Sequence, residues 1–346
     1  MDSNDARATL VPPRGRYAPS PTGPIHVGNA RTALVAWLSV RSVRGVFVLR
    51  NEDLDAPRVV RGLAEEQRRD LEWLGLDWDE GPDRGGEHGP YEQGLRSRHY
   101  LEALRRLEAR SRLFPCGLTR RELRGVASAP HGPESAPYPA SLRPTGLEPR
   151  WLERLLASED AGAAVRFRVD PVEVAWEDLV LGSMRERVDL EVGDFVLRRR
   201  DGLWAYQLAV VVDDLAMAID EVVRGADLVG STGRQILLFE ALEGRAPRFG
   251  HVPLMVTPAG EKLSKRDQAL TVAALRGAGL SPELVVGYLA YTLGLRDRVE
   301  DASPAELVGD HEWGKLLSGE TIVPPDLAER LRRRRRVPRP GGSDAG

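Results

Sequence analysis

The chain has 346 residues, of which 42% are hydrophobic and 29% charged, and its formal net charge is −3. This length is typical of a globular protein of two or three domains with ample room for a buried core. A protein that holds nucleic acid over its whole surface would usually be basic, so any contact with RNA must use local patches.

The sequence also argues against secretion and membrane insertion. Residues 1–13 have no apolar core, as a signal peptide would, and no apolar run reaches the roughly 18 residues that a membrane helix needs. Cys116 is the single cysteine, which excludes an intrachain disulfide and a zinc site made mainly of cysteines. We therefore expect a soluble cytoplasmic protein that has no membrane partner.

The first elements follow the order strand, loop, helix, strand. Residues 15–18 predict the end of a strand, and the prolines of residues 19–24 predict a loop. Residues 29–41 have the apolar spacing of a helix, and residues 46–49 form a short apolar run typical of a buried parallel strand. This βαβ unit is the building block of a doubly wound parallel sheet, so we predict an α/β fold of the Rossmann-like kind.

The middle of the chain predicts two amphipathic helices, at residues 63–74 and 91–110. Residues 116–150 are rich in Pro, Gly, Ser and Ala and predict an inserted subdomain or a long surface excursion. Beyond them, short apolar runs predict further strands at residues 165–169, 188–191, 195–197, 210–212 and 221–223.

Three more helices are predicted near the carboxyl end, at residues 232–242, 269–277 and 282–293. The last of them has Ser281 in the capping position and Pro282 at its first turn. From residue 324 the sequence is poor in apolar residues and contains five consecutive arginines at 332–336, which predicts a disordered basic tail. Such a tail would be solvated, although the arginines could also attract an RNA backbone.

Two segments have the composition of a nucleotide site. The segment PSPTGPIHVGN at residues 19–29 is a rigid loop that enters a helix, with His26 and Gly28 at its mouth. The free N–H groups of a helix start and an imidazole donor both suit phosphate. The segment KLSKR at residues 262–266 is a cationic loop that could neutralise a triphosphate. Taken singly, each segment also has a simpler interpretation, as a helix-capping turn and as an exposed charged turn.

Together the two segments resemble the class I aminoacyl-tRNA synthetases, in which the HIGH and KMSKS motifs share one ATP. HVGN at residues 26–29 stands for HIGH, and KLSKR stands for KMSKS. Within that class the chain is similar to the glutamyl branch between about residues 14 and 293. The segments that carry this likeness are RYAPSPTG (16–23), LRNEDLD (49–55), DFVLRRRDG (194–202) and VVVDD (210–214).

The resemblance implies a division of the chain around a catalytic domain. The expected parts are a flexible N-terminus (1–13), the first half of the catalytic domain (14–112), an inserted subdomain (113–190), the second half with the KMSKS loop (191–268), a helical part (269–323) and the disordered tail (324–346).

The resemblance further implies an ATP site in which His26 and Lys265 are catalytic, because they bind the phosphates in the transition state. Mg²⁺ is expected to neutralise the leaving pyrophosphate. The residues that the resemblance places around ATP are Pro24, His26, Gly28, Asn29, Lys262, Ser264, Lys265 and Arg266.

A glutamate substrate has two carboxylates and one ammonium group, so a selective site needs cations and an anion. By resemblance, Arg16 and Arg224 hold carboxylate. Glu52 and Ser20 lie by the ammonium group, and Tyr206 adds a hydroxyl. The full set of implied glutamate-binding residues is Arg16, Tyr17, Ala18, Pro19, Ser20, Glu52, Tyr206 and Arg224. The alternative is that the charged members form structural ion pairs and that Tyr206 belongs to the core.

The part after KMSKS, residues 267–346, leaves no room for the helical anticodon-binding part of a full glutamyl-tRNA synthetase. In this the chain resembles the shorter glutamyl-Q tRNA(Asp) synthetases, as do the segments LWAYQLAV (203–210), RGADLVGST (224–232) and ASAPHG (127–132). That likeness implies an ATP-dependent ligase that activates glutamate without tRNA and transfers it to queuosine in the anticodon of tRNA(Asp).

Three other functions stay open at this point. The chain could be an ordinary glutamyl-tRNA synthetase that charges the tRNA 3′ end, a catalytically inactive RNA-binding paralogue, or a nucleotidylyltransferase of the same fold class. No motif in the sequence reads queuosine, so the acceptor follows from length and family likeness alone. We expect the protein to be a monomer.

The family often has a zinc site in the inserted region, built from a Cys-x-Cys pair and a later Tyr-x-x-x-Cys. This chain keeps Cys116 and Tyr138, but Leu118 and Leu142 stand where the other two cysteines would be. Two protein ligands cannot close a four-coordinate zinc site, so we expect no zinc and no metal-binding residues. His131 is the one alternative ligand that the segment offers.

Overall fold

The computed structural model describes residues 12–119, 122, 137–158, 162–263 and 267–333. Several sequence predictions lie outside these residues: most of the flexible N-terminus, His131, the last three arginines of the run at 332–336, and the ATP-site residues Ser264, Lys265 and Arg266.

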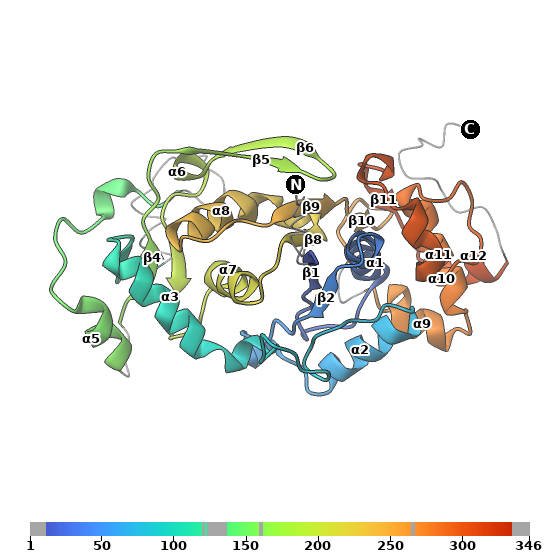
Figure 1. Cartoon of the computed structure of the whole chain (residues 1–346), viewed down its shortest axis with the longest axis horizontal. Coiled ribbons are helices and arrows are strands. Elements are labelled where there is room, and N and C mark those ends of the chain that lie inside the picture. The colour runs from blue at the N-terminus through green and yellow to red at the C-terminus, as the bar shows by residue number, and fades with distance from the viewer. Residues whose placement is uncertain (1–11, 120–121, 123–136, 159–161, 264–266, 334–346) are drawn as a thin grey trace, which may run out of the picture.

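A six-stranded sheet forms the centre of the molecule (Figure 1). Its strands, in spatial order, are β2 (Val46–Leu49), β1 (Arg14–Tyr17), β8 (Glu221–Gly225), β9 (Arg248–Val252), β5 (Glu173–Asp178) and β6 (Gly182–Arg187). Neighbouring strands from β2 to β5 pair in parallel, and β6 pairs with β5 as an antiparallel hairpin. This confirms the predicted α/β fold with a mostly parallel sheet.

Helices cover both faces of this sheet, with α1 (Val27–Ser42) on one face and α7 (Tyr206–Ala216) and α8 (Thr232–Ala241) on the other (Figure 1). The alternation of side chains along each strand builds two cores. In β8, Val223 packs into the core with α1, whereas its neighbour Val222 packs into the core with α7 and α8. At Gly15 of β1 a Cβ would lie 2.4 Å from Val40 Cγ2, so the glycine lets α1 pack tightly against the strand.

A smaller antiparallel sheet lies at one end of the molecule, with strands β3 (Leu113–Cys116), β4 (Ala164–Phe167) and β7 (Phe195–Arg198). The stretch 113–190, which we predicted to be an inserted subdomain, therefore contributes to both sheets. Its strands β3 and β4 pair with each other and with β7, while β5 and β6 extend the main sheet. The domain boundaries themselves stay a prediction.

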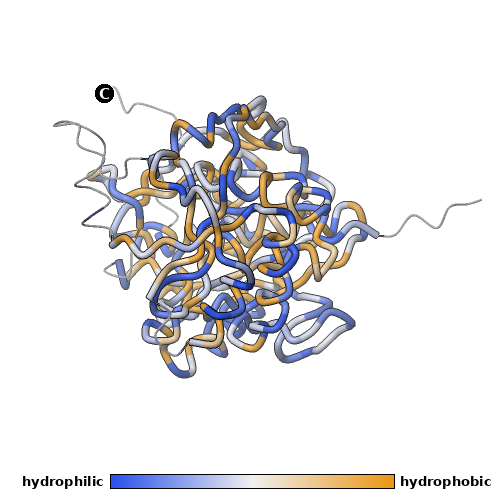
Figure 2. The backbone as a smooth tube through the Cα atoms, turned by 90° about the vertical axis from the view of Figure 1, so that its left-hand side faces the viewer, coloured by the Kyte–Doolittle hydropathy of each residue, from blue (hydrophilic) through white to orange (hydrophobic). Residues whose placement is uncertain are grey.

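The remaining described helices and strands lie mostly outside the central sheet. They are α2 (Leu63–Trp73), α3 (Ser97–Ala109), α5 (Trp151–Ala157), α6 (Val188–Glu191), α9 (Val272–Gly277), α10 (Pro282–Leu293), α11 (Pro304–Leu307), α12 (Leu327–Arg332), β10 (Met255–Val256) and β11 (Thr321–Ile322). Short 3₁₀ helices occur at Ala56–Arg58, Gln93–Leu95, Ala140–Leu142, Ala226–Ser231, Gln268–Leu270, Val308–Asp310 and Trp313–Lys315. Figure 2 shows hydrophobic stretches of the chain running through the interior and hydrophilic stretches at the outer loops.

The cap predicted for α10 is confirmed, because the Leu284 N–H donates to Ser281 Oγ at 3.2 Å. Two predicted strands are wrong: residues 210–212 belong to α7, and residues 188–191 form α6. A continuous apolar run does not distinguish a buried strand from a buried helix, and α7 is buried from Leu208 to Asp214. The helix predicted at residues 91–110 starts later, at Ser97, after a 3₁₀ turn.

Part of the predicted disordered tail is also ordered. Helix α12 buries Leu327 and Leu331 in the same core as α1 and α10. Its two leucines, at positions i and i+4, form one apolar stripe along the helix. The surrounding arginines make the average composition of the segment polar, so composition alone does not predict a buried helix. In the described part of the chain, no helix has the length and hydrophobicity that a membrane span requires.

Candidate active site

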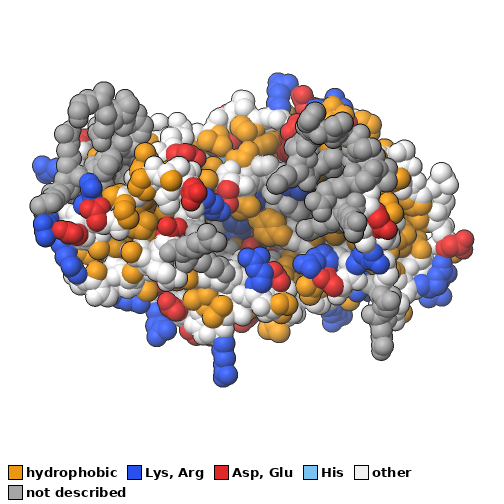
Figure 3. Space-filling view, turned by 180° about the vertical axis from the view of Figure 1, so that it is seen from behind, with side chains coloured by type: hydrophobic (Ala, Val, Ile, Leu, Met, Phe, Trp, Pro, Cys, Tyr) orange, Lys and Arg blue, Asp and Glu red, His pale blue; other side chains and the backbone are white. Residues whose placement is uncertain are grey.

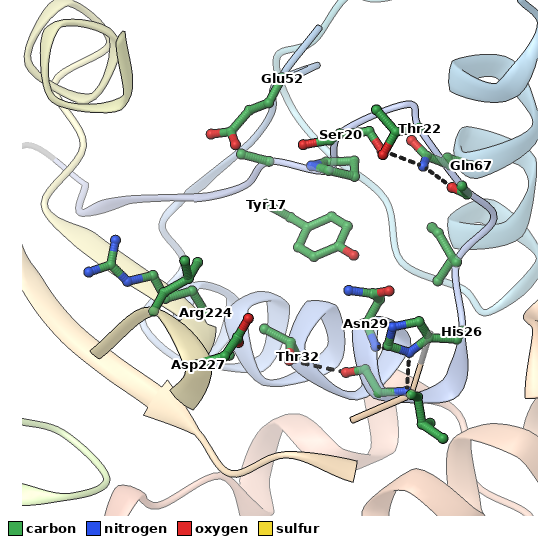
Figure 4. Close-up of a pocket in the computed structure, with 18 of the residues that line it drawn as sticks. Tyr17, Ser20, Thr22, His26, Asn29, Thr32, Glu52, Gln67, Arg224 and Asp227 are labelled. Atoms are coloured by element: carbon green, nitrogen blue, oxygen red, sulfur yellow. Dashed lines mark hydrogen bonds between the residues drawn. The ribbon is translucent and has the colours of Figure 1, made fainter. Parts of the chain in front are cut away.

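A cavity of about 840 Å³ lies at the carboxyl ends of the parallel strands, within the size range of small-molecule sites. Its walls come from the loops that follow β1, β2, β8 and β9, where open α/β sheets bind their ligands. Figure 4 shows Ser20, Glu52, His26, Arg224 and Asp227 around this cavity.

The cavity brings together residues that the sequence places more than 200 positions apart. The implied glutamate-binding residues along its wall are Arg16, Tyr17, Ala18, Pro19, Ser20, Glu52, Tyr206 and Arg224. The implied ATP-binding residues along it are Pro24, His26, Gly28, Asn29 and Lys262. Their ligand roles stay predictions, as do those of residues 264–266, which lie outside the described chain.

His26 caps helix α1 with its own ring. Its Nδ1 accepts hydrogen bonds from the N–H groups of Gly28 at 3.1 Å and Asn29 at 3.2 Å. Because Nδ1 is the acceptor, the proton of the neutral ring must sit on Nε2. Burial, followed by the nearby charge of Lys262, lowers the pKa of His26 to about 4. At neutral pH the ring is therefore a fixed, uncharged N–H donor.

Gly28 leaves room for that ring. A Cβ at this position would lie 3.1 Å from His26 Nδ1 and 3.5 Å from Met255 Cβ. A side chain at Gly28 would therefore crowd the imidazole. This explains on steric grounds why a glycine stands at this position of the HVGN segment.

The lowered pKa of His26 predicts that its ring stays uncharged from about pH 8 to about pH 5, where a free histidine with a pKa near 6.5 would become charged. The measurement is a ring ¹H–¹³C NMR titration, with the His26 signal assigned by its loss in His26→Gln. We expect that signal to stay constant in this range. A midpoint for His26 near that of a free histidine would contradict the prediction.

Arg16, Asp214, Arg50 and Glu52 form a buried chain of alternating charge. Arg16 Nε lies 3.3 Å from Asp214 Oδ1, and Arg50 NH1 lies 2.6 Å from the same atom. Arg50 NH2 lies 3.2 Å from Glu52 Oε1, and the Arg50 side chain is fully buried. Burial raises the pKa of Asp214, but the two arginines more than offset this and hold it below its usual range. Two cations and two anions balance, so this network places Arg16 and Glu52 without leaving net charge.

Arg224 differs from Arg16 because its partners are neutral. It is 4% exposed, and it donates from Nε to His251 Nε2 at 3.0 Å, from NH1 to Gln235 Oε1 at 2.6 Å and from NH2 to Thr232 Oγ1 at 2.8 Å. None of these three partners is a carboxylate, and neither is Tyr206, whose side chain also hydrogen-bonds with Arg224. Burial lowers the pKa of Arg224, which reflects the cost of an uncompensated cation. Two of its five N–H groups have no partner among these three, and the wall of the cavity includes Arg224.

His251 is oriented by a second contact. Its Nε2 accepts from Arg224, so its Nδ1 carries the proton and donates to Asp178 Oδ2. Burial is the largest effect that lowers the pKa of His251, which keeps the ring neutral. Asp178 and His251 thus hold Arg224 by way of a neutral ring.

Several of these positioning residues were missed by the sequence analysis. Gln67 Nε2 in α2 donates to the carbonyl oxygens of Ser20 at 3.1 Å and Gly23 at 2.7 Å, which holds the loop after β1 in place. Asp227 forms an ion pair with Lys262 at the cavity wall. No local pattern marks Gln67, but Asp227 lies in the RGADLVGST segment, three residues after Arg224.

The residues considered above for a zinc site form a small hydrophobic cluster. Phe114, Cys116 and Tyr138 are buried together, and Leu118 and Leu142 pack against them. The Tyr138 hydroxyl donates to the Leu142 carbonyl oxygen at 3.2 Å. In the part of the chain that the structure describes, no group of three or more His, Cys, Asp or Glu side chains is placed to hold a metal ion. The two leucines therefore have a packing role here.

Comparisons with known proteins agree with this geometry. The model of the family "tRNA synthetases class I (E and Q), catalytic domain" matches residues 13–302. The chain is 50% identical over 319 residues to a glutamyl-Q tRNA(Asp) synthetase of Symbiobacterium thermophilum, covering 92% of this chain and 98% of that protein. A protein of the same name from Nitratidesulfovibrio vulgaris is 43% identical, with the same two coverages.

Longer relatives match over only part of their length. A glutamate–tRNA ligase of Lactiplantibacillus plantarum is 38% identical over 80% of this chain but 57% of its own length. Among solved structures, a glutamate tRNA ligase from Elizabethkingia meningosepticum in complex with its amino acid superimposes with a TM-score of 0.80 and 28% identity. That match covers 93% of this chain and 69% of the other.

Proposed function

Since the chain belongs to the class I tRNA synthetase family for glutamate and glutamine, we propose that it activates glutamate with ATP and transfers it to queuosine in the anticodon of tRNA(Asp). The observation that carries the first half is the buried Arg224 with uncharged partners. The second half is supported by the relatives named glutamyl-Q tRNA(Asp) synthetase, which match this chain along nearly their whole length.

The cavity supplies one group for each charge of glutamate. Arg16 and Arg224 attract the two carboxylates, and Glu52 accepts from the ammonium group. Burial raises the pKa of Tyr206, so its hydroxyl stays a donor at neutral pH. Glutamine presents an amide where glutamate has its second carboxylate, and an amide leaves the charge of one arginine unpaired. We therefore propose that the site selects glutamate over glutamine by charge.

Activation needs no protein nucleophile. The glutamate α-carboxylate attacks the α-phosphorus of ATP, the bond to the β-phosphate breaks, and pyrophosphate leaves with the electron pair. The protein contributes position and charge stabilisation. His26 donates from Nε2 to a phosphate oxygen, and we propose that Lys262 and the residues of the KMSKS-like loop, Lys265 foremost, close over the phosphates.

We propose that a magnesium ion binds on this side of the cavity together with the triphosphate, where Asp227 could exchange its ion pair with Lys262 for the metal. Asp227 offers a carboxylate near His26, and Mg²⁺ in nucleotide sites takes one or two carboxylates and keeps water and phosphate as its other ligands. When bound, it neutralises charge on the leaving pyrophosphate.

Two other functions have less support. An ordinary glutamyl-tRNA synthetase would charge the tRNA 3′ end, but proteins of that name match this chain over a smaller share of their length. An inactive RNA-binding paralogue would have no need for a buried Arg224 whose hydrogen-bond partners are all uncharged, because burying such a cation lowers stability unless a ligand anion compensates it. We also propose that the protein acts as a cytoplasmic monomer.

An RNA that approaches the surface would contact acidic and basic side chains together, and not one continuous basic patch. On the face drawn in Figure 3, basic and acidic side chains are interspersed among hydrophobic ones. This agrees with the net charge of −3, and it favours contacts at local basic sites beside the cavity.

The activation half is tested by exchange of labelled pyrophosphate into ATP, with no RNA present. We expect exchange when glutamate is added, and exchange lower by about 30-fold or more with glutamine, because loss of one buried charge pairing costs about 2–5 kcal/mol. Equal exchange with both amino acids would contradict charge selection. Exchange that appears only after tRNA is added would contradict RNA-independent activation.

A further inference from the structure

Helix α2 holds one end of the loop that leads to His26. Gln67 of α2 is 3% exposed, and its Nε2 donates to the carbonyl oxygens of Ser20 at 3.1 Å and Gly23 at 2.7 Å. Figure 4 shows Gln67 at this loop, and His26 lies farther along the same segment. The path of the backbone before His26 therefore depends on where α2 lies.

Helix α9 holds the other end of the same loop. The Val272 N–H, in the first turn of α9, donates to the Ile25 carbonyl oxygen at 2.8 Å. Thr271 forms an isolated antiparallel β-bridge with His26, and its hydroxyl caps α9 by accepting from the Ala274 N–H at 3.2 Å. The start of α9 is thus joined to the backbone of the residues that place the imidazole.

Asp70 and Arg276 connect the two helices to each other. Asp70 lies three residues after Gln67 in α2 and is fully buried, and Arg276 NH1 of α9 lies 2.9 Å from its Oδ1. The Arg276 guanidinium also lies over the ring of Trp73 in α2, 5.8 Å from the ring centroid. Figure 1 shows α2 and α9 next to each other, as these contacts require.

The Asp70 carboxylate is charged at neutral pH in spite of its burial. Burial raises the pKa of Asp70 to about 6; the charge of Arg276 in α9 opposes this rise. Within α2, Glu66 raises the pKa further and Arg69 lowers it. Because the resulting pKa lies below 7, most molecules carry the ionised carboxylate that Arg276 can pair with.

We propose that Asp70 and Arg276 are positioning residues for glutamate activation, because their ion pair closes a contact triangle made of loop 20–26, α2 and α9. Gln67 joins the loop to α2, the ion pair joins α2 to α9, and Ile25 joins α9 back to the loop. The inference rests on the proposed function, since it assigns the rigidity of this loop to the activation step. Asp70 and Arg276 are not among the residues that line the first cavity, so they act through the loop.

A closed triangle restrains the loop more than two separate contacts would, because neither helix can shift along the loop without straining the other. The His26 Nε2–H donor stabilises phosphate charge only where its distance to the phosphate oxygen is correct. A displacement on the order of 1 Å in such a site can reduce the rate by about 100-fold. The ion pair therefore affects catalysis through the position of an imidazole that it does not touch.

The test breaks the triangle of the full chain at two of its three sides. Arg276→Met removes the ion pair, and Gln67→Met removes the donor to the loop while keeping a side chain of similar length. Arg276→Lys keeps a cation that can pair with Asp70. Arg69→Met is the matched control, because Arg69 is an exposed arginine of α2 that adjoins Asp70 in the sequence.

Two measurements are made on each variant. The first is glutamate-dependent pyrophosphate exchange without RNA, with kcat and KM determined separately. The second is the ring ¹H–¹³C NMR signal of His26, which reports the position of the imidazole without any turnover. Urea unfolding shows that the rates belong to folded protein, which is expected because Leu71 of α2 and Leu275 of α9 keep their places in one apolar core.

We expect Arg276→Met and Gln67→Met each to lower kcat by about tenfold or more and to shift or broaden the His26 signal. In Arg276→Met the KM for glutamate should stay within about twofold, because the charged network of Arg16 and Glu52 has no member in α2 or α9. Arg276→Lys should recover most of the rate, since an ammonium supplies the same charge. Arg69→Met should change neither measurement.

The double variant separates a shared triangle from two independent structural effects. If both contacts act through one triangle, breaking it a second time adds little, and the double variant should exchange at nearly the rate of the slower single variant. Losses that multiply in the double variant would overturn the inference. An unchanged His26 signal in Arg276→Met would also overturn it, as would wild-type exchange in that variant.

Failure of the proposed function has a different signature, because the wild-type protein itself would then show no glutamate-dependent exchange. The His26 signal still decides on the triangle in that case: a change in both single variants supports it, and no change overturns it. If Arg276→Met does not fold, Gln67→Met and Arg276→Lys give the answer through the same two measurements. Wild-type exchange and an unchanged His26 signal in Gln67→Met would then overturn the inference.

Discussion

Replacing Arg224 by alanine is expected to reduce glutamate-dependent pyrophosphate exchange by about 30-fold or more, because removing one partner of a buried charge pair costs about 2–5 kcal/mol. The loss should appear mainly as a higher KM for glutamate, since Arg224 lies with the implied glutamate residues and its contacts lie away from the ATP loop. Arg224→Lys should recover little activity, because an ammonium cannot reproduce the planar, bidentate contact of a guanidinium.

The same substitution should leave the unliganded protein at least as stable as the wild type. Arg224 has uncharged partners, so the free-energy cost of burying its charge is offset only when a carboxylate binds. Exchange kinetics and urea unfolding on one preparation would show both effects, with the exposed Arg298→Ala as the control. Exchange that stays within about threefold of wild type would contradict the assignment of Arg224 to glutamate, since it corresponds to less than about 1 kcal/mol.

Replacing Asp213 by alanine should have the largest effect on stability. Asp213 is fully buried in α7 and accepts from Arg96 Nε at 2.5 Å, Gln93 Nε2 at 2.7 Å and the Tyr100 hydroxyl at 2.9 Å. The substitution leaves Arg96 buried without its carboxylate, and breaking such a pair costs about 3–5 kcal/mol. Urea unfolding at neutral pH measures this loss.

Glu173→Ala is the matched comparison, because it removes a carboxylate from an exposed ion pair with Arg185. Its effect should stay within about 0.5 kcal/mol. If Asp213→Ala unfolds at the same urea concentration as Glu173→Ala, then the Arg96–Asp213 pair does not hold α3 against α7.

Local signals explain which elements could be predicted from the sequence. The loop after β1, helix α1 and helix α10 have prolines, glycines or a serine cap at their ends. Such residues set the backbone conformation of their immediate neighbours, so the sequence alone predicts where these elements begin and end. Strand β9 contains Gly250, which packs beneath Trp313, and glycine weakens any strand pattern. In α7 the run of valines predicted a strand, and burial of the helix on several sides removed the polar face that would have shown a helical period.

The residues of the candidate site likewise fall into those that the sequence predicts and those that it does not. Residues that lie in a strand or just after one, such as Arg16, Arg224 and Glu52, stand inside contiguous motifs and could be named from the sequence. The partners that orient them could not. Gln67 contacts Gly23 across 44 positions, and His251 contacts Asp178 across 73. Such contacts depend on how whole helices and strands pack together, and no single segment of the sequence predicts them.

The proposal that queuosine accepts the glutamate is tested most directly by incubating the protein with ATP, Mg²⁺, labelled glutamate and tRNA. Two tRNA pools are compared, one from cells that make queuosine and one from cells that cannot. The terminal adenosine is removed from half of each pool, which takes away the terminal ribose and leaves the anticodon intact. We predict that label enters the queuosine-containing tRNA whether or not it is trimmed, and that it does not enter the other pool. Label that enters both pools and disappears on trimming would show that the protein charges the tRNA 3′ end, and would contradict the proposed function.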